Sequence, residues 1–373
     1  MEGKAVYGEL LRLLKARSSV IEDRGMEIEI KSIPDSAPGP GMDGDLDPRV
    51  LKVLGNQRIG SLFPESIRTG SLDPVTLDMG DIRASMGWPN MDVTAGGIYT
   101  EERAIPGTDR PIPVRIYSPG KPARMPAVVF FHGGGFIGGT VKAVENPCKA
   151  LAEKAGAVVV SVDYRLAPEH PFPAGLTDCF NVVAWVHAKA RELDIDEKRI
   201  AVAGDSAGGN LSAACAIMDR DGKTGMIALQ ALIYPTLDLV CRPCEEYTWD
   251  LSEFNIRHHR ELIEGIISAM RGDAVLLSSV YLQGRDSADP LVSPLYVPDA
   301  SGLAPALILT AEYDALRLEA EAFARKLTKA SVRTRLIRYR GMDHAFMDKI
   351  GLYPQAEDCI EEIAAEVRKL KTA

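Results

Sequence analysis

Several features that define other classes of protein are scarce in this sequence. In its 373 residues no apolar run approaches the roughly 18 residues that a membrane-spanning helix needs. Positive charge is not in excess, because 43 Lys and Arg stand against 52 Asp and Glu, for a net charge of −9. Nucleic-acid binding usually requires a basic stripe. The sequence therefore favours a protein with neither a membrane span nor a nucleic-acid partner.

Cysteines are also few, at positions 148, 179, 215, 241, 244 and 359, in a chain too large to need a disulfide framework. Only Cys241 and Cys244 have the CxxC spacing of redox dithiols and zinc ligands. The nearby His258 and His259 are adjacent, whereas a zinc finger separates its histidines by three to five residues, and no thioredoxin-like unit surrounds the pair. We expect reduced thiols, no metal site and a cytoplasmic protein.

The first residues predict a short amphipathic helix rather than a signal peptide. A signal peptide needs an unbroken apolar stretch of about 7–15 residues, but charged residues interrupt the apolar set Val6, Leu10, Leu13 and Leu14. The segment 31–48 is rich in proline and glycine, which excludes a regular helix or central strand. It is predicted to be a linker or extended arm.

Apolar runs typical of buried strands begin after residue 98. They are continuous rather than alternating, which is typical of parallel strands covered on both faces. Helical patterns at 176–191, 207–218 and 319–329 lie between them. This alternation predicts a doubly wound α/β sheet, with strands at 114–117, 127–131, 157–162, 200–203, 229–234, 307–310 and 335–339.

The alternation of strands and helices fails between residues 236 and 289, where a helical-looking stretch includes Trp249, Phe254 and Leu262. An insertion after the carboxyl end of a strand usually covers the site at that end of the sheet. We therefore expect this segment to cover the functional site.

Gly204-Asp-Ser-Ala-Gly208 supplies a candidate nucleophile, Ser206. A strand-like run precedes the motif and a helix start follows it, as a nucleophile elbow requires. Small residues must flank the serine because the turn is sharp. A P-loop would need a lysine, and a dinucleotide site would need GxGxxG; neither is present here.

His132-Gly-Gly-Gly-Phe136 follows another buried strand. In acyl transfer, backbone N–H groups stabilise the oxyanion of the tetrahedral intermediate, each by roughly 2.7–4 kcal/mol. Glycines let the backbone approach that oxygen closely. Gly133 and Gly134 are the candidate donors, together with the amide of Ala207 after the nucleophile.

A base and an acid are expected after Ser206, because elbows of this kind have the chain order Ser, acid, His. His258 and His259 fall in the irregular insertion, whereas His344 follows a strand and a Gly-Met-Asp turn. His344 is the predicted base.

For the acid, Asp314 lies in the loop just past the strand at 307–310, and Glu312 lies nearer the strand end. Asp343 ranks third behind these two, because side chains of sequence neighbours such as Asp343 and His344 rarely converge. The acid would hold the imidazole tautomer and stabilise the imidazolium without taking the proton.

With these motifs assembled, the chain resembles the hormone-sensitive-lipase-like branch of the α/β-hydrolases, the bacterial family IV carboxylesterases with an HGGG motif. The resemblance extends from about Asp47 to the C-terminus. It is carried by HGGGF at 132–136, DYRLAPEHPFPA at 163–174, GDSAGGN at 204–210, DPLVSP at 289–294, Glu312-Tyr-Asp314 and His344-Ala-Phe346.

The resemblance implies a mostly parallel central sheet flanked by helices, with a helical cap. It also implies Ser206, Asp314 and His344 as a catalytic triad, with an oxyanion hole of Gly133, Gly134 and Ala207. We expect an N-terminal extension over 1–46, a cap region over 47–97, and a catalytic domain over 98–373 with a cap insertion at about 236–289.

The predicted function is hydrolysis of short-to-medium acyl esters through an acyl-enzyme, without metal or organic cofactor. A deacetylase or amidase acting on an acylated small molecule is an alternative. A peptidase is disfavoured because no large accessory domain is present. The chain could instead be a ligand-binding protein without catalytic activity, but the presence of all three triad residue types argues against this alternative. The expected partner is a small-molecule ester, and a homodimer is left open.

Overall fold

A ten-stranded sheet runs through the part of the chain that the computed structural model describes, residues 2–16, 18–33, 43–55, 79–84, 86–120 and 124–370. The strands lie in the order β1-β2-β10-β9-β8-β7-β5-β6-β4-β3. Their bounds are β1 Ser18–Asp23, β2 Met26–Lys31, β3 Tyr99–Ile105, β4 Ile112–Ser118, β5 Met125–Phe131, β6 Val158–Val162, β7 Ile195–Asp205, β8 Leu229–Ile233, β9 Ala306–Tyr313 and β10 Thr334–Asp343.

The middle of the sheet is parallel, from β2 through β10, β9, β8, β7 and β5 to β6. Antiparallel pairs occur at the two ends, β1 with β2 on one side, and β3 with β4 and β4 with β6 on the other. All seven predicted strands are present, with each end within five residues of the prediction, so the α/β class is confirmed.

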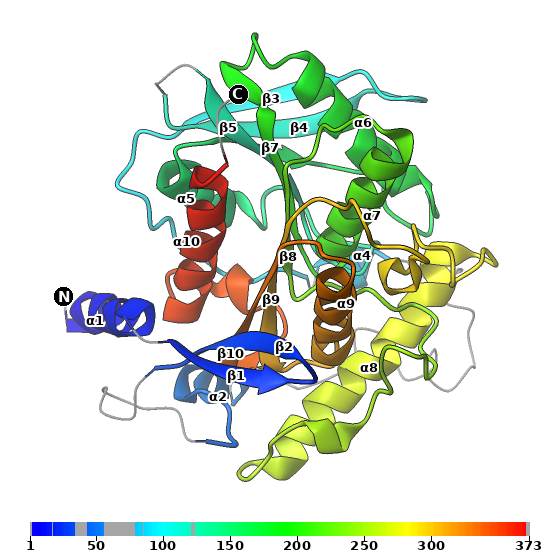
Figure 1. The fold of residues 1–373 in the computed structure, drawn as a ribbon. Coiled ribbons are helices and arrows are strands. Elements are labelled where there is room, and N and C mark those ends of the chain that lie inside the picture. The colour runs from blue at the N-terminus through cyan, green and yellow to red at the C-terminus, as the bar shows by residue number, and fades with distance from the viewer. Residues whose placement is uncertain are drawn as a thin grey trace.

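Burial of the central strands on both faces explains their continuous apolar sequence. In β5, Val128 and Phe130 belong to one apolar cluster, whereas Val129 and Phe131 belong to another on the opposite face. In Figure 1, α5 and α10 cover one face, and α6, α7 and α9 cover the other. The helix bounds are α1 Glu2–Ala16, α2 Pro48–Leu54, α4 Gly80–Ala84, α5 Glu145–Ala155, α6 Ala174–Ala188, α7 Ala207–Gly222, α8 Arg260–Leu282, α9 Arg317–Lys329 and α10 Pro354–Arg368, with 3₁₀ turns η2 Leu251–Glu253, η3 Pro294–Tyr296 and η4 Phe346–Lys349.

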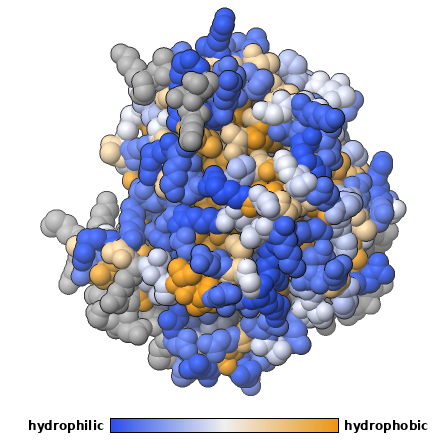
Figure 2. Space-filling model, in the orientation of Figure 1, coloured by the Kyte–Doolittle hydropathy of each residue, from blue (hydrophilic) through white to orange (hydrophobic). Residues whose placement is uncertain are grey.

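The N-terminal segment contains the predicted helix and also a hairpin that the sequence pattern did not predict. Helix α1 packs on α10 of the sheet layer, where the hydroxyl of Tyr7 donates to Glu357 at 3.0 Å. Strands β1 and β2 then extend the sheet beside β10. The side chains of Val20 and Ile21 on β1 are exposed, and Figure 2 shows apolar surface among the polar residues of this face of the molecule. Residues 34–42 of the predicted arm lie outside the described residues.

The insertion after β8 contains one long helix, α8, of 23 residues. Among the described residues it is the one helix long and apolar enough to cross a membrane by length and composition. Its apolar side chains are used within the protein, since Ile263 and Ile267 are buried and others line a cavity. Of the predicted cap region, α2 and α4 are described, and residues 56–78 lie outside the described part.

Candidate active site

Ser206 lies at the sharp turn between β7 and α7, in a backbone conformation that non-glycine residues rarely adopt, with φ 54° and ψ −116°. Its N–H donates to Ile233 O on the neighbouring strand at 2.9 Å. A Cβ on Gly208 would lie 1.9 Å from Phe131 O, and one on Gly204 would lie 2.4 Å from Gly208. The small residues around the serine are therefore a steric requirement of the turn.

His344 bridges the serine and a buried carboxylate. The Ser206 hydroxyl lies 3.0 Å from His344 Nε2, and Nδ1 of the same ring lies 2.7 Å from Asp314 Oδ2. Asp314 is 1% exposed, and its other oxygen accepts from Leu316 N–H at 2.9 Å. The edge of the Tyr234 ring contacts the imidazole. The structure thus brings together the three residues that the sequence motifs single out.

The competing residues have other partners. Glu312 accepts from the backbone N–H of Gly341 at 2.7 Å, so it fixes the turn before the histidine. Asp343 is buried, and its Oδ1 has no hydrogen-bond partner among the described residues. His259 contacts Asp45 at 2.9 Å beside the start of α8. Neither carboxylate reaches His344, and the geometry selects Asp314.

The glycine loop after β5 departs from the prediction at one residue. Gly133 N–H donates to Asp205 Oδ1 at 2.9 Å, so this amide is engaged and is not available to an oxyanion. In the described part of the chain no acceptor is recorded for the amides of Gly134, Gly135 and Ala207. Gly134 has φ +118°, and its carbonyl accepts from two later amides in the loop.

Two carboxyl groups next to the site affect each other's ionisation. Burial, with the nearby Asp348 charge, raises the pKa of Asp205, and burial raises the pKa of Asp348 to about 6. Asp348 lies on η4, four residues after His344. No sequence motif marked Asp348, because only the fold brings η4 to the nucleophile turn.

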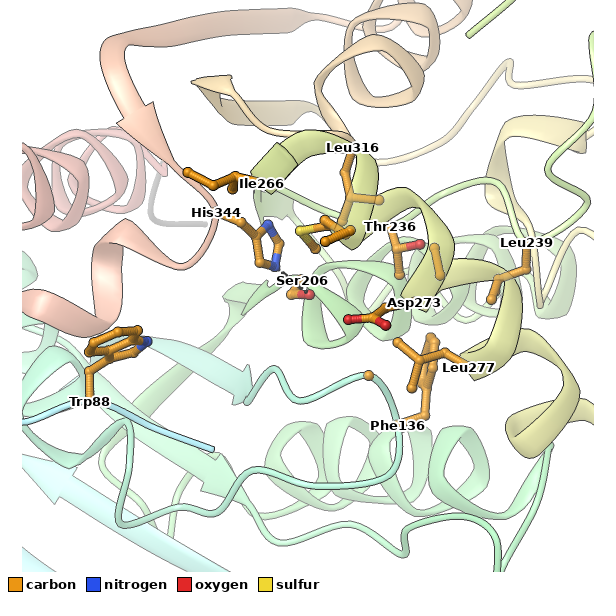
Figure 3. Close-up of a pocket in the computed structure, with 14 residues that line it drawn as sticks. Trp88, Phe136, Ser206, Thr236, Leu239, Ile266, Asp273, Leu277, Leu316 and His344 are labelled. Atoms are coloured by element: carbon orange, nitrogen blue, oxygen red, sulfur yellow. Dashed lines mark hydrogen bonds between the residues drawn. The ribbon is translucent and has the colours of Figure 1, made fainter. Parts of the chain in front are cut away.

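A cavity of about 280 Å³ opens beside the nucleophile (Figure 3). Figure 3 shows Ile266, Asp273 and Leu277 entering from α8, opposite Phe136. The full lining is Trp88, Gly135, Phe136, Ser206, Thr236, Leu239, Ile266, Ala269, Met270, Asp273, Ala274, Leu277, Leu316 and His344. A second cavity of about 240 Å³ shares Ser206 and His344 and includes Asp205 and Asp348. The site therefore offers an apolar volume next to a hydrogen-bonded Ser–His–Asp set.

Comparison with known proteins agrees with this fold. A family model described as alpha/beta hydrolase fold matches residues 128–348. A carboxylesterase of Mycobacterium tuberculosis, NlhH, is 38% identical over 266 residues, 69% of this chain and 78% of the relative. The chain belongs to the hormone-sensitive-lipase-like esterases of the α/β-hydrolase fold.

Other members of this esterase family are similar over comparable lengths. An arylesterase of Saccharolobus solfataricus is 36% identical over 251 residues, 66% of this chain and 77% of the relative. A solved esterase of Pyrobaculum calidifontis superposes with a TM-score of 0.68 at 34% identity, covering 88% of this chain and all of the other. This family member is therefore a carboxylic ester hydrolase.

The cavity of this esterase depends on residues that the sequence motifs did not mark. Helix α8 supplies six of the lining residues, and Trp88 comes from the segment before β3. The sequence signal for α8 was a helical-looking stretch within the insertion, without clear bounds. Among the described residues no group of three or more His, Cys, Asp and Glu could hold a metal ion.

Proposed function

We propose that this esterase hydrolyses short-to-medium acyl esters through a triad of Ser206, His344 and Asp314. The observation that supports this proposal is a chain of two contacts through the His344 ring: Nε2 lies 3.0 Å from Ser206 Oγ, and Nδ1 lies 2.7 Å from Asp314 Oδ2. Attack of Oγ on the ester carbonyl passes the hydroxyl proton to Nε2. His344 then gives this proton to the leaving alcohol, and water hydrolyses the acyl-enzyme by the same relay.

We assign the oxyanion hole to the amides of Gly134, Gly135 and Ala207. Ala207 is the first residue of α7, where backbone N–H groups have no partner within the helix. Gly135 lines both cavities beside Ser206. Gly133 instead holds the loop in place through Asp205.

The acyl chain is assigned to the 280 Å³ cavity under α8. This volume lies near the lower limit of roughly 300–1,000 Å³ that small-molecule sites have, and the lining is mostly apolar. Both properties favour short-to-medium acyl chains, with a small-molecule ester as the partner.

We further propose that the chain is organised as an extension over 1–46, a cap region over 47–97 and a catalytic domain over 98–373, with the insertion at 236–289 completing the cap. α8 supports the role of the insertion, because it lines the cavity.

Six free cysteines support action in the reducing cytoplasm.

The test is hydrolysis of p-nitrophenyl esters from acetate to palmitate by the wild-type chain and by Ser206→Ala. We expect activity to be highest at butyrate or hexanoate, and to be lost in the variant. Labelling of Ser206 by an alkyl phosphonate, detected by mass spectrometry, identifies the nucleophile. Full activity in Ser206→Ala would overturn the triad, and activity that rises steadily up to palmitate would overturn only the assignment of chain length.

A further inference from the structure

Helix α8 forms one wall of the acyl cavity, so its position determines how much acyl chain the cavity can hold. In Figure 3 the helix passes close to Ser206 and carries Ile266, Asp273 and Leu277. It contributes Ile266, Ala269, Met270, Asp273, Ala274 and Leu277 to the lining. The contacts that hold α8 against the catalytic domain therefore also affect which acyl chains the cavity accepts.

Beneath α8 lies a buried pair of acids, Asp238 and Glu319, which are 1% and 0% exposed. Glu319 Oε1 accepts from the N–H groups of Leu237 at 2.6 Å and Asp238 at 3.3 Å. Asp238 Oδ1 accepts from two further amides of the same turn at 2.9 and 3.0 Å. The pair thus fixes the segment that provides Thr236 and Leu239 to the cavity wall.

Arg271 extends from α8 to this pair. Its Nη1 lies 3.8 Å from Glu319 Oε2, and its guanidinium carbon lies 5.6 Å from the centre of the Trp249 ring. Trp249 Nε1–H donates to Ala315 O at 3.0 Å, directly before the cavity residue Leu316. Arg271 therefore contacts two segments that carry the cavity wall: it lies against the carboxyl group of Glu319 and over the ring of Trp249.

Several groups surround the acids, and among the described residues that act on Glu319 the cation is Arg271. Tyr247 OH donates to Asp238 Oδ2 at 2.7 Å and lies 3.4 Å from Glu319 Oε2. The thiol of Cys241 and the hydroxyl of Tyr296 complete the titratable neighbours. Burial, followed by the charge of Asp238, raises the pKa of Glu319 to about 8, and Arg271 opposes that rise.

We propose that Arg271 is a positioning residue that fixes α8 over the buried acids and thereby sets the upper length of acyl chain that the cavity accepts. The inference rests on the proposed assignment of the acyl chain to this cavity. Without Arg271, α8 loses the contacts of its guanidinium group with Glu319 and with the Trp249 ring. The cavity then opens where long chains lie, while acetate, which fills little of it, is turned over as before.

The experiment compares Arg271→Met, Arg271→Lys and a matched control, Arg260→Met, in the full chain. Arg260 lies on the first turn of the same helix and pairs with Glu264 at an exposed site. kcat and KM are measured with p-nitrophenyl acetate, butyrate, octanoate and laurate. Thermal unfolding shows that each variant is folded.

In Arg271→Met we expect kcat for acetate to stay within about twofold, while the laurate-to-butyrate ratio of kcat/KM rises about tenfold, mainly through KM. Arg271→Lys should restore most of the wild-type ratio, and Arg260→Met should leave it unchanged. An unchanged ratio in Arg271→Met, or an equal loss for all four esters, would overturn the proposal. If Arg271→Met does not fold, Arg271→Gln takes its place, and a wild-type ratio in that variant overturns the proposal as well.

These outcomes are separable from failure of the proposed function. The chain-length ratio can change only if an ester enters the cavity and is hydrolysed, whereas Ser206→Ala tests the nucleophile directly. Activity that persists in Ser206→Ala with an altered ratio in Arg271→Met would reject the triad and retain the role of Arg271.

Discussion

The proposed catalytic residues and helix α8 beside them are held in place in different ways. Ser206, His344 and Asp314 are joined by contacts of 3.0 and 2.7 Å at the ends of neighbouring parallel strands. α8 is joined to the same region by the contact of Arg271 with Glu319 at 3.8 Å, by a hydroxyl bond of 3.2 Å from Ser278 Oγ to Leu239 O, and by a backbone bond of 2.9 Å from Phe172 N–H to Tyr281 O. The proposed triad therefore rests on the ends of sheet strands, whereas the cavity wall formed by α8 is held by few polar contacts.

Asp314→Asn should have the largest effect, because it leaves the shape of the triad intact but weakens the orientation and charge stabilisation of His344. We expect kcat to fall about 10⁴-fold with KM little changed. Asp343→Asn is the matched control, since this neighbouring carboxyl does not contact His344. Equal losses in the two variants would contradict the assignment of Asp314 over Asp343.

Asp205→Ala should come next, because it removes the acceptor that holds Gly133 N–H and so loosens the oxyanion loop. We expect kcat to fall about 10- to 100-fold, less than the loss from removing an oxyanion donor outright. Asp205→Asn keeps an oxygen at this position and should recover most of the activity. Steady-state kinetics with p-nitrophenyl butyrate distinguishes the two, and the same loss in both would indicate that charge, not the hydrogen bond, matters.

Glu319→Gln tests the ionisation of the acid beneath α8, through the pH dependence of the free energy of unfolding. In the folded chain Glu319 keeps its proton up to about pH 8, whereas its ordinary pKa is 4.5. The unfolded chain therefore loses this proton first as the pH rises, and the folded state loses stability between about pH 4.5 and 8. Glu319→Gln removes this contribution, so its free energy of unfolding in urea should fall less than that of the wild type across this range.

Glu321→Gln is the control of opposite sign on the same helix. Although burial opposes its ionisation, Arg317 and Arg338 lower the pKa of Glu321. Its carboxylate therefore stabilises the fold above its ordinary pKa, and the variant should be less stable than the wild type near pH 7. If both variants showed the same dependence on pH, the assigned ionisation states would be wrong.

Ser278→Ala should have the smallest effect, since it removes the half-buried hydroxyl bond between α8 and Leu239. We expect a loss of about 1 kcal/mol in stability and less than about a twofold change in the laurate-to-butyrate ratio. A change as large as that in Arg271→Met would show that the hydroxyl bond of Ser278 holds α8 as firmly as Arg271 does.

The same division explains what could be predicted from the sequence. The three side chains that meet at Ser206 could be named from the sequence, because an elbow needs small residues at fixed spacing and chain order then leaves few histidines and carboxylates. The hydrogen bond from Gly133 N–H could not be predicted from the sequence, since its acceptor Asp205 lies 72 residues away. The contact of Arg271 with Glu319 likewise joins an insertion to a helix beyond β9, and no local pattern marks it.

The N-terminal hairpin shows the same limit in another form. Met26, Ile28 and Ile30 alternate with charged residues, a pattern typical of a strand. Its hairpin partner β1 directly precedes it in the chain, but nothing local indicates where the hairpin joins the sheet. Its partner β10 is contributed by the other end of the chain, and the structure alone connects the two.

The pairing of β2 with β10 has a consequence for the timing of synthesis. Glu29 lies opposite Ile337, and His344 follows directly after β10. At about 5–20 residues per second, a ribosome needs roughly 15–60 s to make the chain between these partners. During that interval the hairpin has no β10 beside it, and its apolar side chains remain exposed. The same late strand delivers the base, so the nascent chain remains inactive until its two ends have met.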